Sequence, residues 1–161
     1  MANRLGGLAD ELGRLLKERG ETVGVAESAA GGLVSAALLA VPGASAYFLG
    51  GGVIYTHPAR RGLLGLTGDQ VTMQGASEEF ALLMARSAAE RLGATWGVGE
   101  TGAAGPSGSR YGHPAGHVAL AVAGPVERTA TMQTGSADRE ANMWAFAEEA
   151  LKLLEAAMGE A

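Results

Sequence analysis

Three short stretches of the chain place a hydroxyl side chain at the end of an apolar run and beside glycines. They are residues 26–32 (Ala-Glu-Ser-Ala-Ala-Gly-Gly), 52–56 (Gly-Val-Ile-Tyr-Thr) and 101–106 (Thr-Gly-Ala-Ala-Gly-Pro). A hydroxyl becomes a nucleophile when a base removes its proton, and amides exposed at glycines can bind an anion or an oxyanion. Each stretch alone is equally typical of a turn with a capping hydroxyl, so the case for chemistry rests on the three together.

Other chemical motifs are incomplete in this chain. Residues 97–102 match the GxGxxG pattern of dinucleotide-binding folds, but residues 105–108 (Gly-Pro-Ser-Gly) cannot begin the long helix that this motif requires. His113 and His117 flank a proline and a glycine, and no third metal ligand accompanies them. Because a Walker A motif and a Gly-x-Ser-x-Gly elbow are also absent, we expect no metal and no cofactor.

The composition indicates a compact globular protein. The chain has 161 residues, enough for a single domain over 1–161, with 47% hydrophobic and 18% charged residues. The absence of cysteine excludes disulfides and thiolate metal sites, and a net charge of -5 argues against nucleic acid or an anionic membrane as partner. The N-terminal apolar pattern contains acids, unlike a signal peptide, and no apolar stretch approaches the roughly 18 residues of a membrane span. We therefore expect a cytoplasmic protein.

Hydrophobic periodicity and turn residues predict alternating helices and strands, followed by two adjacent strands and a last helix. Helices are expected over 5–16, 33–38, 58–64 and 77–92 and from Asp138 onward, and strands over 23–26, 47–55, 95–100, 117–123 and 128–134. In the last helix, Trp144, Ala147, Leu151 and Leu154 form the expected buried stripe. This order predicts a single three-layer α/β/α sandwich with a mixed, mostly parallel sheet, in which ligands bind where strands end.

The motifs, taken in order, resemble the C-terminal domain of the CinA (competence/damage-inducible) family. The family pattern runs A-E-S-[CS]-T-G-G, P-G-[SA]-S, G-x-V-x-Y-[ST]-N-x-x-K, G-A-V-S, T-G-x-A-G-P and K-P-V-G-x-V. This chain matches it at 26–28 with 31–32, 42–45, 52 with 55–56, 75–77, 101–102 with 104–106, and at Pro114, Gly116 and Val118. The resemblance covers nearly the whole chain.

The resemblance implies a three-layer sandwich that forms a homodimer, and a reaction. The stand-alone family enzyme is nicotinamide-nucleotide amidase, which hydrolyses the carboxamide of nicotinamide mononucleotide to nicotinic acid mononucleotide and ammonia without a metal. Carried over to this chain, the family nucleophile is Ser28, the position of the family's proton-transfer lysine is Arg60, and Tyr55 and Thr101 complete the catalytic set. The residues expected to bind a small-molecule nucleotide substrate are Glu27, Ala30, Gly31, Gly32, Thr56, His57, Gly102, Ala104 and Gly105.

This sequence departs from the family pattern at residues near the chemistry. Ala29 and Ala30 stand where the family has Cys or Ser and Thr, and His57 stands where it has Asn. Residues 135–139 (Gly-Ser-Ala-Asp-Arg) contain two residues more than the family's G-D-R. The scaffold motifs are retained, whereas the differences lie beside the residues that would react.

The replacement of the family lysine by Arg60 leaves three interpretations open. A guanidinium is effectively never deprotonated in a protein, so it cannot act as a base, and Lys17 and Lys152 lie on the first and last helices. The protein can be an active amidase with another base, for which His57 is the nearest titratable candidate. It can instead bind a nucleotide-like ligand without turnover, with Arg60 and Arg61 as phosphate contacts, or be a structural or interaction paralogue.

Several of these residues also have structural explanations. His57 can be a surface residue before a helix-opening proline, Arg60 a solvated helix residue whose stem packs on Leu64, and Tyr55 a core residue. Glu27 can orient the Ser28 loop through backbone amides or pair with Arg60. If the carried-over roles are right, one pocket should contain Ser28, Tyr55, Arg60 and Thr101.

Overall fold

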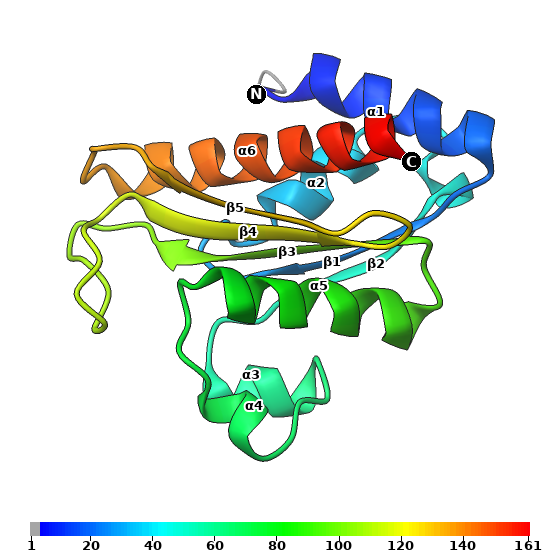
Figure 1. Ribbon diagram of the computed structural model, residues 1–161. Helices are drawn as coiled ribbons and strands as arrows, with labels where there is room; N and C mark the ends of the chain where they lie inside the picture. The colour runs from blue at the N-terminus through cyan, green and yellow to red at the C-terminus, as the bar shows by residue number, and fades with distance from the viewer. Residues whose placement is uncertain (1–3) are drawn as a thin grey trace.

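A five-stranded sheet in the order β2-β1-β3-β4-β5 forms the centre of the computed structural model, which describes residues 4–161 (Figure 1). The strands are β1 (Val23–Glu27), β2 (Phe48–Val53), β3 (Trp96–Ala103), β4 (His117–Ala123) and β5 (Arg128–Gln133). Strand β1 pairs in parallel with β2 and β3, whereas β4 is antiparallel to both β3 and β5, so β4 alone runs against the other four. The expected mixed, mostly parallel sheet is confirmed.

Helices cover both faces of this sheet and make the predicted three layers (Figure 1). On one face lie α1 (Gly6–Arg19), α2 (Leu33–Leu39) and α6 (Arg139–Glu160), and the larger apolar core fills the space between them and the sheet. On the other face lies α5 (Glu78–Leu92), with the short helices α3 (His57–Gly62) and α4 (Asp69–Thr72) packed beyond it. A 3-10 turn over Ala44–Ala46 precedes β2, and no helix within 4–161 is long and apolar enough to cross a membrane.

The helix boundaries follow from local capping chemistry. The hydroxyl of Ser77 accepts a hydrogen bond from the Phe80 amide at the start of α5, and Gly93 ends that helix with a φ of 66°. The carboxylate of Asp138 caps α6 in the same way. At α3, the hydroxyl of Thr56 accepts from the Ala59 amide, and a proline occupies the first turn, where it removes no helical hydrogen bond.

The first two glycines of the GxGxxG match, Gly97 and Gly99, serve helix packing. A Cβ on Gly97 would lie 1.9 Å from the carbonyl oxygen of Ala85, and one on Gly99 would lie 2.1 Å from that of Ala81. Helix α5 therefore packs directly against the backbone of β3 because these positions carry no side chain. Strand β3 also continues past the predicted end at residue 100, so Thr101 and Gly102 lie in the sheet.

Two expectations about local structure need correction, and one short helix is additional. Strand β2 is shorter than the predicted 47–55, and Gly51 lies so close to Ser35 that a Cβ would be 2.2 Å from its Oγ. Helix α4 has no strong periodic pattern over its four residues and was not expected. Trp144 is only half-buried, with the Arg4 guanidinium 5.0 Å from its ring centroid, and the neighbouring Phe146 occupies the core instead.

Candidate functional site

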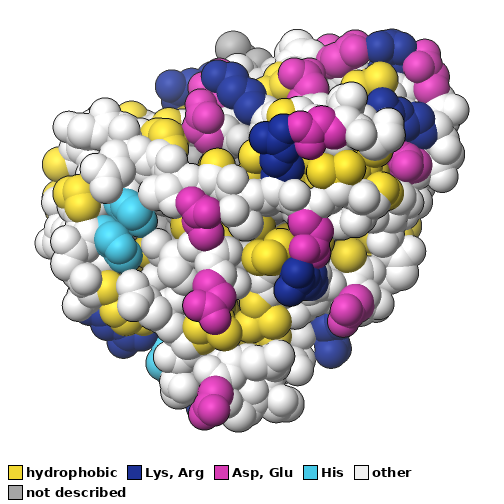
Figure 2. All heavy atoms as spheres, viewed as in Figure 1, with side chains coloured by type: hydrophobic (Ala, Val, Ile, Leu, Met, Phe, Trp, Pro, Cys, Tyr) yellow, Lys and Arg dark blue, Asp and Glu magenta, His cyan; other side chains and the backbone are white. Residues whose placement is uncertain are grey.

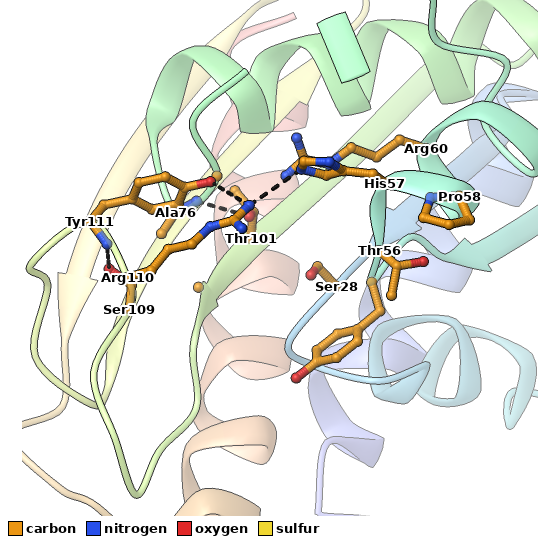
Figure 3. A pocket seen from close by; sticks show the side chains of 13 residues that line it. Ser28, Thr56, His57, Pro58, Arg60, Ala76, Thr101, Ser109, Arg110 and Tyr111 are labelled. Carbon is orange, nitrogen blue, oxygen red and sulfur yellow. Dashed lines mark hydrogen bonds between the residues drawn. The ribbon is translucent and has the colours of Figure 1, made fainter. Parts of the chain in front are cut away.

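A cavity of about 580 Å³ opens where β1 and β3 end (Figure 3). Ser28 follows β1, Tyr55 follows β2, Arg60 belongs to α3 and Thr101 to β3, and all four line this cavity. The structure thus brings together the four residues that the sequence singled out as catalytic, at the edge of the sheet where ligands of such folds bind. The other lining residues are Thr56, His57, Pro58, Gly75, Ala76, Gly102, Ser109, Arg110 and Tyr111.

Ser28 is half-buried and presents an unpartnered hydroxyl. In the view of Figure 3 it lies between the segment that carries Thr56 and the loop that carries Ser109. Its backbone amide donates to Oε1 of Glu100 at 2.8 Å, whereas its Oγ has no hydrogen-bond partner within residues 4–161. The backbone of Ser28 is therefore held while its hydroxyl remains available to a ligand, and no base lies within hydrogen-bond distance of it.

Arg60 lines the cavity but is mainly engaged elsewhere. Its Nη1 donates to the carbonyl oxygens of Val71 and Met73, both at 2.8 Å, and its guanidinium lies 3.9 Å from the Phe80 ring centroid. Burial lowers the pKa of Arg60, yet its guanidinium stays charged near neutral pH because the ordinary pKa of this group is so high. Arg60 thus ties α3 to the α4 segment and α5, and it is not the solvated helix residue that one interpretation assumed. Arg61 is exposed and does not line this cavity.

His57 faces a guanidinium at the mouth of the cavity. Nη2 of Arg110 lies 3.3 Å from His57 Nε2 and donates to the Tyr111 hydroxyl at 3.0 Å (Figure 3). A guanidinium only donates, so Nε2 accepts and the ring proton lies on Nδ1. Desolvation, and then the charges of Arg60, Arg110 and Arg61, lower the pKa of His57, which keeps the imidazole neutral near pH 7.

The loop that presents Arg110 and Tyr111 is organised by a neighbouring hydroxyl. Oγ of Ser109 accepts from the amides of Tyr111 and His113, at 3.2 Å and 3.1 Å, and lies 3.0 Å from Nδ1 of His113. From this loop the sequence motifs single out residues 101–106 and His113, and they miss Ser109, Arg110 and Tyr111. The usable signal was an Arg-Tyr pair in a loop otherwise composed of small residues.

Thr101 holds a turn in the cavity wall. Its Oγ1 accepts from the Ala76 amide at 3.0 Å, and Nε2 of His117 donates to the Ala76 carbonyl at the same distance. These bonds fix Ala76 at a φ of 54°, a left-handed conformation that residues other than glycine rarely adopt. Gln133 donates to Nδ1 of His117, and His113 stacks on that ring at 3.9 Å. Within residues 4–161, no group of three or more His, Cys, Asp or Glu side chains could hold a metal ion.

A second cavity, of about 380 Å³, adjoins the first and shares Tyr55, Gly102 and Ser109 with it. The guanidinium of Arg139 on α6 lines it and donates to the Gly105 carbonyl and, at 3.2 Å, to the Tyr55 hydroxyl. Among residues 4–161, no acidic side chain lines either cavity. By contrast, acidic and basic side chains are interspersed over the face shown in Figure 2. The two cavities thus form a continuous, cationic site.

Glu27 and the residues after Ser28 belong to the support of the site. Glu27 is fully buried; its Oε1 accepts from the amides of Gly32 and Val34, at 3.1 Å and 2.9 Å, and its Oε2 from the amide and hydroxyl of Ser35. Glu27 therefore orients the loop through backbone amides and forms no ion pair with Arg60. The residues expected to bind substrate divide into three groups. The first cavity is lined by Thr56, His57 and Gly102, and the second by Gly102, Ala104 and Gly105. Neither cavity is lined by Glu27, Ala30, Gly31 or Gly32.

Glu100 is the supporting residue that sequence analysis missed. Its side chain is fully buried, and Oε1 accepts from the amides of Ser28 and Ala30 at 2.8 Å and 2.9 Å. Burial raises the pKa of Glu100 to about 7, and the nearby charge of Glu27 adds to this effect. The signal was present as the one acid in the predicted strand 95–100.

A protein-family model matches nearly the whole chain. The model of the CinA C-terminal domain matches residues 6–158. The chain belongs to this family. A CinA-like protein of Prochlorococcus marinus is 49% identical over 112 residues, which cover 69% of this chain and 26% of that protein. A CinA-like protein of Anaeromyxobacter sp. is 44% identical over 154 residues, which cover 92% of this chain and 38% of that protein. This CinA domain spans about a third of the length of these curated relatives.

Solved structures of CinA proteins show the same fold. A CinA superfamily protein of Klebsiella pneumoniae superposes with a TM-score of 0.90 at 28% identity, covering 98% of this chain and 99% of its own. The competence/damage-inducible protein CihA of Agrobacterium tumefaciens gives a TM-score of 0.87 at 34% identity, covering 97% and 96%. The α/β/α sandwich is thus common to the CinA domain of this chain and to these structures.

Proposed function

We propose that this CinA domain hydrolyses the carboxamide of nicotinamide mononucleotide, with Ser28 as the nucleophile. The observation that supports this most is the free Oγ of Ser28 at the family's nucleophile position, in a cavity lined by guanidinium groups and by no acid. An anionic nucleotide fits a site of this charge. The amide carbon would then lie above Ser28, and no metal is required for the reaction.

His57 is the base that best fits the proposed reaction. As Ser28 Oγ attacks the amide carbon, the neutral imidazole takes the hydroxyl proton and returns it to the departing ammonia. Water then attacks the acyl-serine, again losing a proton to the imidazole, and releases the carboxylate and free Ser28. Since Nε2 of His57 accepts from Arg110 in the free protein, substrate binding must draw Arg110 away before His57 can act.

The negative charge of the tetrahedral intermediate must be stabilised by side chains or by the second loop. The amides near Ser28 already face other acceptors. Those of Ser28 and Ala30 donate to Glu100, and the amide of Ala29 also acts on that carboxyl group. The amide of Gly31 donates to the Ser28 carbonyl and that of Gly32 to Glu27. The guanidinium groups that line the first cavity are therefore the available donors. A charged donor aimed at a developing oxyanion is an effective stabiliser in a partly buried site.

The second cavity suits the phosphate of the nucleotide. The amides of Ala104 and Gly105 donate no hydrogen bond within residues 4–161, and both residues line this cavity beside Arg139. Free amides together with a guanidinium are a common arrangement for binding phosphate. The substrate would extend from Ser28 past Tyr55 to Arg139.

The commitment of Arg60 supports a second candidate, ligand binding without turnover. A lysine at this position could release a proton, whereas Arg60 is held by two carbonyl oxygens and stays charged. In this alternative the same cationic site binds a nucleotide-like ligand, and Ser28 contributes a hydrogen bond only.

Incubation with nicotinamide mononucleotide distinguishes the two. We expect ammonia and nicotinic acid mononucleotide in equal amounts, and weaker turnover of nicotinamide riboside, which lacks the phosphate. A family member that retains the lysine serves as positive control. Binding by calorimetry without any product would support the second candidate, and neither binding nor product would contradict both.

The homodimer implied by the family is also a proposal. Strand β2 is an edge of the sheet, and its side chains Leu49 and Val53 are 42% and 41% exposed. An open, partly apolar edge of this kind is a typical pairing surface. Light scattering of the purified chain measures its mass in solution, and a monomer would contradict the proposal.

A further inference from the structure

One carboxyl oxygen directly below the Ser28 turn has no partner. Oε1 of Glu100 accepts from two amides, those of Ser28 and Ala30, and the Ala29 amide also lowers the pKa of this carboxyl group. Oε2 is the buried side-chain polar atom in residues 4–161 that has no partner of hydrogen-bond geometry. Buried polar atoms are nearly always paired, because leaving one unpaired costs free energy. The unpaired Oε2 of Glu100 therefore costs free energy in the folded protein. The other oxygen of this carboxyl group bonds to the backbone of Ser28, which carries the free hydroxyl.

The charges around Glu100 favour protonation of its carboxyl group. Glu27, on the adjacent strand β1, accepts four hydrogen bonds, an arrangement that suits a carboxylate. Two neighbouring buried carboxylates repel each other, so a proton is retained most easily by the acid with fewer donors, which is Glu100. Its side chain is fully buried, and no cation within residues 4–161 pairs with it.

No other element supplies a compensating charge to Glu100. Helix α2 has no ionisable side chain, β4 places Leu120 opposite Glu100, and the buried residues of α1 are apolar or glycine. The buried residues of α6 are apolar apart from Asn142, and Arg139, at its start, bonds to Gly105 and Tyr55. Glu27 is therefore the charged group that faces Glu100.

We propose that Glu100 is a positioning residue for Ser28, whose buried carboxyl group holds the 28–30 turn differently in its protonated and ionised states. The ionised group forms stronger, charge-assisted bonds to the two amides, while the protonated group accepts through a neutral oxygen. The raised pKa of Glu100, about 7, places the change between these states near neutral pH. The effect of Glu100 on catalysis by Ser28 rests on the proposed amidase function, whereas the effect of Glu100 on the conformation of the 28–30 turn does not.

The titration can be followed without any substrate. Carbon-13 NMR of the side-chain carboxyls reports the protonation of Glu100, which Glu100→Gln assigns, and amide NMR reports Ser28 and Ala30. Glutamine retains an acceptor oxygen for both amides but does not titrate. The matched control is Glu78→Gln, which removes an exposed carboxylate that accepts from Thr129 and Thr131 on the other face of the sheet.

We expect the Glu100 carboxyl to titrate near pH 7 and the Ser28 and Ala30 amide signals to move with the same midpoint, in the wild type and in Glu78→Gln. In Glu100→Gln these amide signals should be independent of pH between about 5 and 9. Titration of Glu100 at an ordinary carboxyl value of about 4.3, or amides that ignore its titration, would overturn the proposal. If Glu100→Gln does not fold, the Ser28 and Ala30 amide signals of the wild type still decide, because a shared midpoint near pH 7 supports the proposal and signals independent of pH overturn it.

Kinetics separate this proposal from the proposed function. We expect the pH profile of kcat for amide hydrolysis to have an inflection near pH 7 that Glu100→Gln lacks, with KM little changed. If the Ser28 and Ala30 amide signals follow the titration of Glu100 but no substrate carboxamide is hydrolysed, the proposed function is wrong and the positioning of the 28–30 turn by Glu100 is still supported. If hydrolysis occurs with the same pH profile in both proteins, the proposed function stands and the positioning role is wrong.

Discussion

The two walls that flank Ser28 are built from opposite kinds of interaction. On one side, the loop over residues 27–35 rests on two fully buried acids, Glu27 and Glu100, whose oxygens bind backbone amides. On the other side, the segments over 55–60 and 109–111 present an imidazole, a phenol and guanidinium groups that mostly contact one another at the surface. Ser28 lies at the boundary between an acidic support and a cationic binding surface.

This difference indicates which functions each wall can have. Side chains whose hydrogen bonds go to backbone amides set the position of the chain, so their replacement should change stability and the placement of Ser28. Exposed side chains that pair with one another can exchange those contacts for a ligand, so their replacement should change affinity. Arg60 is the exception, since it lines the cationic wall but bonds to backbone carbonyls.

The largest effect is expected at Ser28, which lies between the acidic and the cationic wall. Ser28→Ala should reduce amide hydrolysis by about 1,000-fold or more, because the nucleophile is removed. The thermal unfolding midpoint should stay unchanged, since the Ser28 hydroxyl forms no hydrogen bond within residues 4–161. Ammonia release and calorimetric unfolding measure both quantities, with Ser87→Ala on α5 as control. Hydrolysis that survives Ser28→Ala would assign the nucleophile elsewhere.

The next effect tests the exceptional position of Arg60. Arg60→Ala should lower the free energy of unfolding by about 3 kcal/mol, because two carbonyl oxygens lose a charged donor. Arg61→Ala, one residue further on the same helix, should change it by less than about 0.5 kcal/mol because Arg61 is exposed. Urea unfolding of the three proteins decides this.

The variant Arg60→Lys separates stability from chemistry at the same position. A single ammonium cannot reproduce the guanidinium geometry, so a loss of about 1 kcal/mol is expected. An increase in amide hydrolysis despite this loss would show that Arg60 limits the reaction. Equal or lower hydrolysis would indicate that another base, such as His57, already serves.

Much of the scaffold was predictable because its signals are local. The capping residues Ser77 and Asp138 and the helix stop at Gly93 lie within a few residues of the boundaries that they determine. Ser28, Tyr55 and Thr101 could be brought together from the motif order, since each follows an apolar run that ends at the same sheet edge, and Arg60 lies five residues after Tyr55. The error at Trp144 arose because helical spacing leaves a rotation ambiguity that only packing resolves, in favour of Phe146.

The supporting acids were less predictable because their partners are remote in sequence. Glu100 bonds to amides that lie 72 and 70 residues earlier, and backbone amides leave no trace in the sequence pattern. Glu27 was noted beside Ser28, but whether it faces the loop or Arg60 depends on the direction of a strand side chain. Arg110 reaches His57 across 53 residues, so its role also follows from the fold.

The acidic wall predicts an unusual dependence of stability on pH. The pKa of Glu100 is raised from 4.5 to about 7 in the folded protein, so the folded state retains a proton that the unfolded chain releases. Stability from this group is therefore complete below about pH 4.5 and is lost as pH rises to about 7, by about 3 kcal/mol. Urea unfolding at about pH 5 and pH 8 should show this loss in the wild type and lack it in Glu100→Gln. An equal pH dependence in the two proteins would contradict a raised pKa of Glu100.

The last prediction tests the cationic wall at Arg110. Arg110→Ala should weaken the binding of nicotinamide mononucleotide by about tenfold, or about 1.4 kcal/mol. The unfolding free energy should stay nearly unchanged, because Arg110 is itself exposed and bonds only to the side chains of His57 and Tyr111. The same change should raise the pKa of His57, since Arg110 is one of the three cations that lower it. Calorimetry and a proton NMR titration of His57 measure the two shifts. Weaker binding with an unmoved His57 would mean that Arg110 contacts the ligand without acting on the base, whereas a moved His57 with unchanged affinity would place the ligand's charge at Arg139 alone.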